Sequence, residues 1–215
     1  MKYINLFEYF KSNKSELINY INNFNIEKVQ LPFSKKEYES FVHNLSPETH
    51  DEDGRLKDSE YYNGFLYNSE KYCREVTSNY EYLKLVKYLF DFNSNYKFYD
   101  LGCGIGSLLY FVKKIGYKNT VGVEYQEELV KIHKKLNLDV IYGDLLKMDL
   151  SFLKDADIIY LYKPIYDDSL ANKLIDKILK NTKDSVVIIY CDPDEYFYDR
   201  EIISTSNLNQ YILLK

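Results

Sequence analysis

Residues 99–107 read Tyr-Asp-Leu-Gly-Cys-Gly-Ile-Gly-Ser and place three alternate glycines where a strand pattern changes to a helical one. Gly102 can adopt a turn conformation that is closed to other residues, Gly104 lets a ligand lie against the backbone, and Gly106 is expected to let the helix pack tightly on the strand. Free amides at the start of that helix favour an anionic group. Because tight strand-to-helix turns without a ligand carry similar glycines, this motif alone leaves the function open.

Downstream of Tyr96, strand patterns and helical patterns alternate with short connections, which is typical of a parallel sheet covered by helices. The fold class is therefore predicted to be α/β, with a mostly parallel sheet and an antiparallel hairpin at the C-terminal end. Strands are expected at 97–101, 120–124, 139–142, 157–162 and 185–190, helices at 105–115, 127–136 and 169–180, and the hairpin strands at 201–205 and 210–214.

Upstream of residue 95 the pattern is helical and less regular. We therefore divide the chain into a helical N-terminal extension, residues 1–95, and an α/β domain, residues 96–215. In three places a polar residue is followed three positions later by Glu, ahead of an apolar-periodic stretch, which is the spacing of a capping box. The cap residues are Asn13, Ser34 and Ser78, and the helices are expected near 14–24, 35–43 and 79–91.

A long polar stretch without periodicity, residues 46–68, separates the second and third of these helices. Such a segment is either a functional lid or a mobile loop. Its acidic run at 51–54 lacks the alternating oxygen ligands and the closing Glu of a calcium loop, so no metal site is expected there. Four tyrosines in and after this stretch can close over a site or pack in the core: Tyr61, Tyr62, Tyr67 and Tyr72.

The composition is that of a globular protein, with 215 residues of which 46% are hydrophobic and 28% are charged. A formal net charge of −5 provides no global positive field, which disfavours broad nucleic-acid affinity and makes DNA an unfavoured partner. No apolar run approaches the length of a membrane span, and the first residues lack a secretory signal. We therefore expect a cytoplasmic protein whose scattered cysteines are reduced: Cys73, Cys103 and Cys191.

Acidic residues stand near the ends of three successive expected strands, namely Asp100, Glu124 and Asp144. The carboxyl ends of parallel strands meet at one edge of a sheet, so these carboxylates are expected to converge on one elongated ligand. Three acids suit a ligand that presents an ammonium group, a diol and a ring with hydrogen-bond donors, rather than one rich in phosphate.

At these residues the sequence resembles the class I S-adenosylmethionine (SAM)-dependent methyltransferases, whose first motif has the form acidic-x-Gly-x-Gly-x-Gly. The resemblance covers residues 96 to about 191 and implies a Rossmann-like fold with SAM as cofactor. It also implies that Asp100 and the glycine loop hold the methionine part, Glu124 the ribose hydroxyls and Asp144 the adenine amine. The cofactor-binding residues implied in this way are Asp100, Leu101, Gly102, Cys103, Gly104, Gly106, Glu124, Tyr125, Asp144 and Leu145.

Two alternatives to an active methyltransferase remain open. In a nicotinamide dinucleotide or phosphate site Glu124 can bind a ribose equally well, but Asp100 and Asp144 have no role in that fingerprint. A methyltransferase-like subunit that binds SAM without catalysis, and acts with a partner, is the second alternative. The intact glycine loop together with all three acids is evidence against this second alternative.

The methyl acceptor is expected to bind after the fourth strand, where Tyr162, Lys163 and Tyr166 are the candidate catalytic residues. This segment lacks the Asn/Asp-Pro-Pro-Tyr/Phe motif of amino methyltransferases and a Pro-Cys nucleophile, which again disfavours DNA. Its Lys-Pro and following helix look somewhat like small protein-lysine methyltransferases. A protein side chain of lysine type or a small molecule is therefore favoured as acceptor, and RNA remains possible. Asp167 or Asp168 with Asp192 and Asp194 can mimic a magnesium site, but a helix cap is the preferred reading and no metal is expected.

Overall fold

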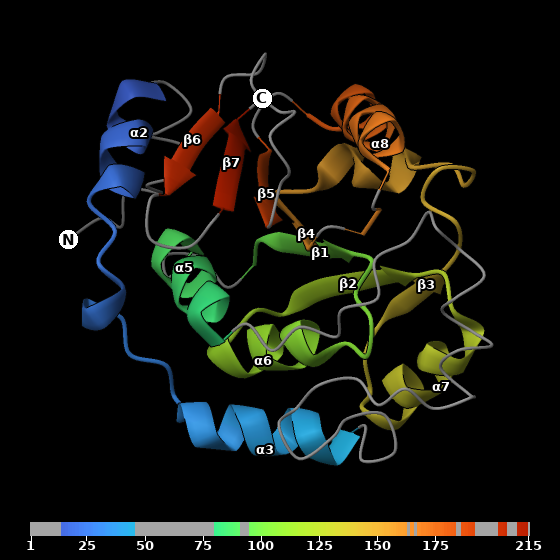
Figure 1. Ribbon diagram of the computed structural model, residues 1–215, viewed down its shortest axis with the longest axis horizontal. Coiled ribbons are helices and arrows are strands. Elements are labelled where there is room, and N and C mark those ends of the chain that lie inside the picture. Colours follow the sequence, from blue (N-terminus) through green and yellow to red (C-terminus); the bar gives the residue numbers. More distant parts are fainter. Residues whose placement is uncertain are drawn as a thin grey trace.

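The computed structural model describes residues 14–45, 80–90, 95–162, 164, 165, 167–183, 186–191, 202–205 and 210–214. A seven-stranded sheet crosses the middle of the molecule, in the order β3-β2-β1-β4-β5-β7-β6 (Figure 1). The strands are β1 Lys97–Leu101, β2 Asn119–Glu124, β3 Val140–Tyr142, β4 Ile158–Tyr162, β5 Val187–Cys191, β6 Ile202–Thr205 and β7 Gln210–Leu214. The α-helices are α2 Lys14–Asn22, α3 Lys35–Leu45, α5 Tyr80–Phe90, α6 Ser107–Ile115, α7 Glu127–Lys135 and α8 Asp168–Asn181, with short 3-10 helices η1 Ile26–Lys28 and η2 Ser151–Asp155.

Five strands, β3-β2-β1-β4-β5, pair in parallel, so the predicted α/β class with a parallel sheet is confirmed. Helices connect these strands, as parallel pairing requires. The last two strands run in the opposite direction. β7 pairs antiparallel with β5, and β6 pairs antiparallel with β7. Because β1 pairs in parallel with both β2 and β4, the carboxyl ends of these three strands lie together at one edge of the sheet, which we call the carboxyl edge.

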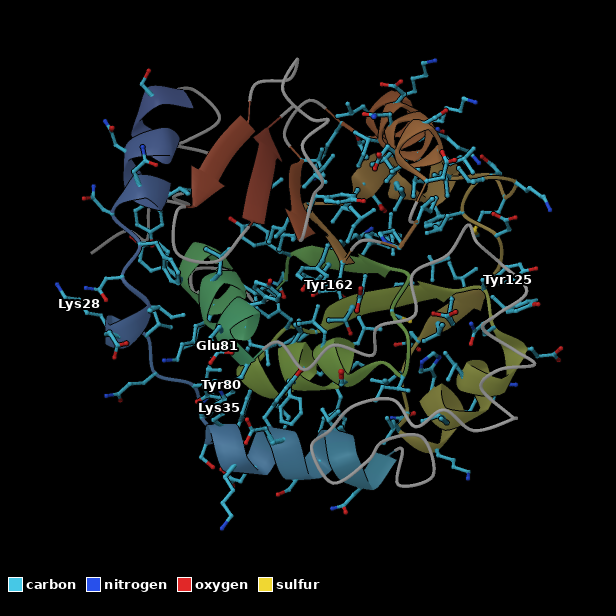
Figure 2. The ribbon with its side chains drawn as sticks, viewed as in Figure 1. Lys28, Lys35, Tyr80, Glu81, Tyr125 and Tyr162 are labelled. Atoms are coloured by element: carbon cyan, nitrogen blue, oxygen red, sulfur yellow. The ribbon has the colours of Figure 1, made fainter. Side chains whose placement is uncertain are left out.

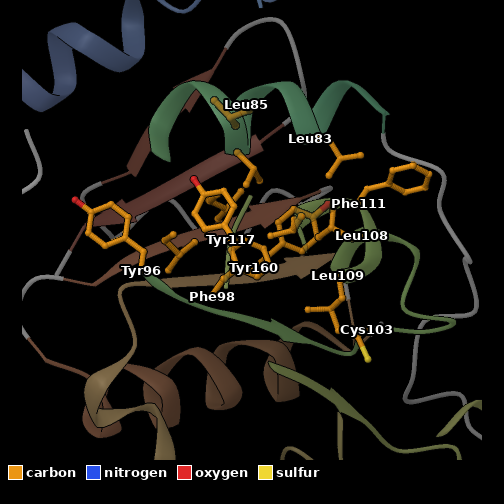
Figure 3. Close-up of a cluster of buried hydrophobic side chains, with 14 of the residues drawn as sticks. Leu83, Leu85, Tyr96, Phe98, Cys103, Leu108, Leu109, Phe111, Tyr117 and Tyr160 are labelled. Carbon is orange, nitrogen blue, oxygen red and sulfur yellow. The ribbon is translucent and has the colours of Figure 1, made fainter. Parts of the chain in front are cut away.

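The central strands are apolar on both faces, because helices cover both sides of the sheet. Alternate residues of β1 and β4 point to opposite faces: Phe98 and Tyr160 belong to the cluster under α5 and α6, whereas Leu101 and Leu161 belong to the cluster under α8. Figure 3 shows the first cluster between α5 and the sheet. The second cluster includes the buried face of α8, which is formed by Ala171, Leu174, Ile175 and Ile178.

The N-terminal helices pack on the same face as α5 and α6. Tyr38 of α3 lies 4.6 Å from Phe111 of α6 between ring centroids, and Phe41 stacks on Tyr110 at 4.1 Å. Lys35 of α3 forms an ion pair with Glu81 of α5 at 3.1 Å (Figure 2). The extension thus shares the hydrophobic core of the sheet.

The capping box predicted for α3 is present. The Ser34 N–H and hydroxyl donate to Glu37 Oε2 at 2.6 and 2.8 Å, and the Glu37 N–H donates to Ser34 Oγ at 3.2 Å. The caps expected at Asn13 and Ser78, and the polar stretch 46–68 with its acidic run and tyrosines, lie outside the described residues. Within the described residues, no helix combines the length and apolar character needed to cross a membrane.

Candidate active site

The glycine motif forms the turn between β1 and α6. Gly102, Gly104 and Gly106 all have positive φ angles, of 84°, 53° and 78°, so the helix begins at Ser107 and not at the predicted Ile105. The N–H groups of Gly102 and Cys103 both donate to the carbonyl of Val123 in β2, at 2.8 and 3.0 Å. The turn is therefore fastened to the neighbouring strand, at the carboxyl edge.

The three glycines have different surroundings. A Cβ on Gly104 would meet nothing within 4 Å, which leaves the space above this residue open. A Cβ on Gly106 would lie 2.8 Å from His133 Cδ2 and 2.7 Å from Leu138 Cδ1. The prediction that Gly106 serves packing on the strand was therefore wrong, because its close neighbours are a side chain of α7 and one from the turn after that helix.

Glu124 at the end of β2 is buried, with 7% of its surface exposed. Its Oε2 accepts the Gly104 N–H at 2.9 Å, and its Oε1 accepts the N–H groups of Tyr125 and Gln126 at 2.8 and 2.9 Å. Burial raises the pKa of this carboxyl, against the three backbone hydrogen bonds, which lower it. A carboxylate has about four acceptor positions, so one position remains after these three bonds.

Asp100 lies in β1 on the face of Phe98 and is only 3% exposed. Burial, and then the negative charge of Glu124, raise the pKa of Asp100 to about 8. Among the described residues no lysine or arginine contributes to this shift. Two buried carboxyls thus share the carboxyl edge, and nothing described there neutralises them.

Asp144 follows β3, and its Oδ1 accepts the Leu146 N–H at 2.9 Å. Lys147 lies 3.4 Å from its other oxygen. From α8, the Lys177 ammonium donates to three carbonyls of the same turn, those of Leu145, Leu146 and Met148, at 3.0, 3.1 and 2.5 Å. Lys177 was not expected from the sequence, because its contact depends on how α8 crosses the sheet.

Tyr125 and Tyr142 form an exposed aromatic pair beside Glu124. Their exposed fractions are 46% and 53%, and their rings stack with 6.5 Å between centroids and an interplanar angle of 21°. Tyr125 was expected from the sequence, whereas Tyr142 was not. The signal available for Tyr142 was its place opposite Glu124 in the register of β2 and β3.

Besides Asp100 and Glu124, three of the expected cofactor-binding residues have buried side chains. Leu101 is fully buried in the cluster under α8, Leu145 is 7% exposed in the same cluster, and Cys103 is 8% exposed under α6. Burial raises the pKa of the Cys103 thiol well above its usual value, so this thiol is unreactive as a nucleophile. Leu101 faces away from Asp100, and only its backbone can meet a ligand at that edge.

On the acceptor side, Tyr162 ends β4 and is half-buried (Figure 2). Its ring lies 5.9 Å from that of Tyr82 in α5, which the sequence did not connect with this site. Lys163 and Tyr166 lie outside the described residues, as do Asp192 and Asp194. Asp167 caps α8, since its Oδ1 accepts the Leu170 N–H at 2.8 Å. Within the described part of the chain, no three acidic, histidine or cysteine side chains are arranged to hold a metal ion.

A family model described as a methyltransferase domain matches residues 92–212, which is more than half of the chain. The chain belongs to this family. It is therefore a SAM-dependent methyltransferase of the class I Rossmann-like fold, as the resemblance of its motifs implied. No curated protein matches the sequence of this methyltransferase.

A comparison with solved structures finds matches at low sequence identity. An RNA methyltransferase from Salinibacter ruber in complex with S-adenosyl-L-homocysteine is 20% identical, with a TM-score of 0.52, and the match covers 64% of this chain and 92% of that one. The PH0226 protein from Pyrococcus horikoshii OT3 is 17% identical, with a TM-score of 0.47 and coverage of 74% and 64%. A SAM-dependent methyltransferase from Clostridium acetobutylicum is 18% identical, with a TM-score of 0.42 and coverage of 60% and 54%.

The residues at the carboxyl edge of this methyltransferase fit SAM. Two buried carboxyls that lack a described basic partner suit a positively charged ligand. The open space above Gly104 leaves its backbone accessible. The exposed tyrosine pair beside Glu124 offers a flat apolar surface for a base.

Proposed function

We propose that this methyltransferase holds SAM along the carboxyl edge and transfers its methyl group to an amine, either a lysine side chain of a protein or a small molecule. The pair of buried acids, Asp100 and Glu124, is the observation that carries the cofactor half of this proposal. In it, ionised Asp100 binds the ammonium of the methionine part, because a buried carboxylate next to a second acid is stabilised by a cation. Glu124 uses its remaining acceptor position for the ribose hydroxyls.

The adenine would lie beyond Glu124, where Tyr125 offers a ring face and Asp144 an oxygen for the exocyclic amine. Backbone atoms of Leu101, Gly102, Cys103, Gly104 and Gly106 would complete the contacts on the methionine side, and Leu145 would lie under the base. The hydrogen bonds of Lys177 to the Leu145–Met148 turn support this assignment, because they hold the segment that carries Asp144 in one geometry.

When bound, SAM supplies a methyl group on a cationic sulfur, whose carbon–sulfur bond breaks with its electron pair passing to sulfur. The residues of this chain align a nucleophile with that bond and exclude water. The acceptor amine, unprotonated when it attacks, would form the new bond with its lone pair, and the methylated ammonium would pass a proton to solvent on release. Tyr162, Lys163 and Tyr166 are the candidates for this side of the site, with Lys163 orienting the acceptor.

The acceptor half of the proposal rests on the tyrosines. Tyr162 continues the face of β4 that carries Tyr160, and Tyr160 is the register partner of Asp100. The aromatic pair of Tyr82 and Tyr162 therefore lies on the same face as the buried acid. Ring faces attract an ammonium group, and the negative charge of the chain disfavours polyanions. Both features favour an amine over DNA.

We further propose that the N-terminal extension, residues 1–95, selects the acceptor for the domain at 96–215. Tyr82 supports this assignment, because it belongs to α5 and yet contacts a residue at the end of β4. The helices α2 and α3 pack on the same face, so their outer surfaces lie on the acceptor side of the sheet.

Incubation of the purified chain and fractionated cell extract with SAM labelled in its methyl group tests this function. We expect label in the protein or small-molecule fraction, and loss of that label in Tyr162→Leu with unchanged affinity for S-adenosylhomocysteine. Label in RNA would contradict the protein or small-molecule acceptor but not the activity. Tight cofactor binding without any label would instead favour the catalytically silent subunit.

A further inference from the structure

Helix α7 places one imidazole between the glycines of the cofactor loop. His133 is 1% exposed, and its Nε2 lies 2.5 Å from the carbonyl oxygen of Gly104 and 4.0 Å from Cys103 Sγ. The ring also lies against Gly106, where an added Cβ would approach its Cδ2 to 2.8 Å. One side chain of α7 thus lies against three positions of the motif, Cys103, Gly104 and Gly106.

The contact with Gly104 fixes the tautomer of His133. A carbonyl oxygen can only accept, so Nε2 must carry the proton and donate it. Nδ1 is then an acceptor, and it is buried without a hydrogen-bond partner among the described residues. Burial lowers the pKa of this histidine, which favours the neutral ring.

Stability alone does not account for a histidine at this position. An unsatisfied buried acceptor is unfavourable, and an apolar side chain on this face of α7 would avoid it. Neighbouring positions of the helix, Leu129 and Ile132, are apolar and pack on the same core. What the histidine adds is one directed hydrogen bond, and its partner is the glycine that faces open space.

Gly104 is held at both of its polar groups. Its N–H donates to Glu124 from β2, and its carbonyl accepts from His133 in α7. Its φ angle of 53° lies in the left-handed region. A glycine without restraining hydrogen bonds could adopt many other backbone conformations. The two bonds therefore select one orientation for the peptide planes on either side of this residue.

We propose that His133 is a positioning residue for the cofactor: its Nε2–H holds the Gly104 carbonyl and so fixes the glycine loop in the geometry that receives the methionine part of SAM. This inference rests on the assignment of that loop to the cofactor. It adds a residue from outside the motif, and that residue acts through the loop backbone without touching the ligand.

Calorimetric titration with S-adenosylhomocysteine tests this role in four chains: native, His133→Leu, His133→Gln and Lys134→Gln. Leucine removes the donor, and we expect it to weaken binding about tenfold, the loss of roughly one hydrogen bond. Glutamine places an amide N–H near the position of Nε2 and should restore affinity to within about threefold of native. The exposed neighbour Lys134 should leave affinity unchanged.

Thermal unfolding without ligand separates positioning from stability. His133→Leu should unfold close to the native temperature, because loss of the hydrogen bond to Gly104 and removal of the unsatisfied Nδ1 act in opposite directions. The proposal would be overturned if His133→Leu bound S-adenosylhomocysteine within about twofold of the native chain. It would also be overturned if His133→Leu and His133→Gln lost the same affinity. If the native chain itself does not bind, the assignment of the cofactor site fails instead.

Nitrogen NMR of the ligand-free native chain gives an independent answer should His133→Leu not fold. The sequence contains three histidines, so the His133 signals can be assigned by comparison with His133→Gln. We expect a protonated Nε2 and an unprotonated Nδ1 in His133. A ring protonated at Nδ1 alone would contradict the hydrogen bond to Gly104 and overturn the proposal.

Discussion

Acidic residues at the two edges of the sheet differ in whether basic side chains pair with them. At the amino edge, where β1 and β4 begin, Asp155 pairs with Lys97, and Asp157 pairs with Lys183 and also accepts the Lys97 N–H. At the carboxyl edge, Asp100 and Glu124 are buried, and no ion pair involving them is found within the described residues.

The pKa values follow this difference. Burial alone would raise the pKa of Asp155, but the hydrogen bond and charge of Lys97 outweigh it, so the value lies below the ordinary one. In Asp100 burial acts together with the charge of Glu124, and the pKa rises to about 8. The acids at the amino edge pair with lysines of this chain, whereas no lysine or arginine among the described residues pairs with Asp100 or Glu124.

Asp100→Asn should produce the largest effect. The substitution keeps the shape of the side chain but removes the charge, so we expect the affinity for S-adenosylhomocysteine to fall about a hundredfold, as for a buried charge pair that loses one partner. Calorimetry measures this loss, and thermal unfolding at pH 8.5 should show a stability equal to or above native. An affinity close to native would remove Asp100 from the cofactor site.

The pH dependence of cofactor binding should follow the raised pKa of Asp100. Below about pH 8 this carboxyl holds a proton in the free protein, and the cation requires it ionised, so binding should release a proton. Affinity should then rise with pH up to about 8, by at most about tenfold per pH unit. Calorimetry at pH 7 in two buffers of different ionisation enthalpy measures the proton release, and Asp100→Asn should abolish it.

The stability of the free protein should depend on pH with the opposite sign. In the unfolded chain Asp100 loses its proton near its ordinary pKa of 3.8, so the folded state binds more protons between that value and about 8. The contribution of this group to stability is therefore complete below 3.8 and is lost as the pH rises towards 8. A native chain whose pH profile of unfolding equals that of Asp100→Asn would contradict this assignment.

Gly104→Ala and Gly116→Ala form a matched pair at the two ends of α6. Both glycines have positive φ, and at both an added Cβ meets nothing within 4 Å. Each substitution should therefore lower the free energy of unfolding, by about 1–3 kcal/mol. Only Gly104→Ala puts a methyl group where the cofactor is proposed to lie, so only it should weaken S-adenosylhomocysteine, by about tenfold. Equal affinities of the two variants would place the ligand elsewhere.

Asp155→Asn at the amino edge should have the smallest effect. Its ion pair with Lys97 is nearly half-exposed and screened by water, so we expect a loss below about 1 kcal/mol in the free energy of unfolding. That loss should vanish in acid, because the lowered pKa of Asp155 stabilises the fold only above the ordinary value of 3.8. Affinity for S-adenosylhomocysteine should not change. A weakened affinity would contradict the assignment of cofactor binding to the carboxyl edge alone.

Local pattern was enough to predict the strands and helices of the sheet. The strand at 97–101 and the helix at 35–43 agree with β1 and α3 to within two residues, because runs of period 2 and 3.6 are written in the sequence itself. Asp100 and Glu124 were likewise predictable as neighbours, since parallel strands end at one edge.

Contacts between segments far apart in the sequence could not be predicted from such local patterns. Tyr82 and Tyr162 are 80 positions apart, and nothing in either segment indicates the packing of α5 on β4. His133 sits on the apolar face of a predicted helix, which marks it as unusual, but the carbonyl that it reaches depends on the angle of α7 to the glycine turn. Leu101 was assigned through a family motif, which fixes backbone position and does not report which face a side chain takes.

The aromatic packing of α3 on α6 has a consequence for truncated forms of this enzyme. The rings of Phe111 and Tyr110 are covered by aromatic rings of α3, a helix that lies outside the residues matched by the family model. A fragment limited to residues 92–212 would expose this aromatic face of α6 to solvent. Substitutions at Tyr38 or Phe41 are therefore expected to loosen the packing of α6, the helix that follows the glycine turn.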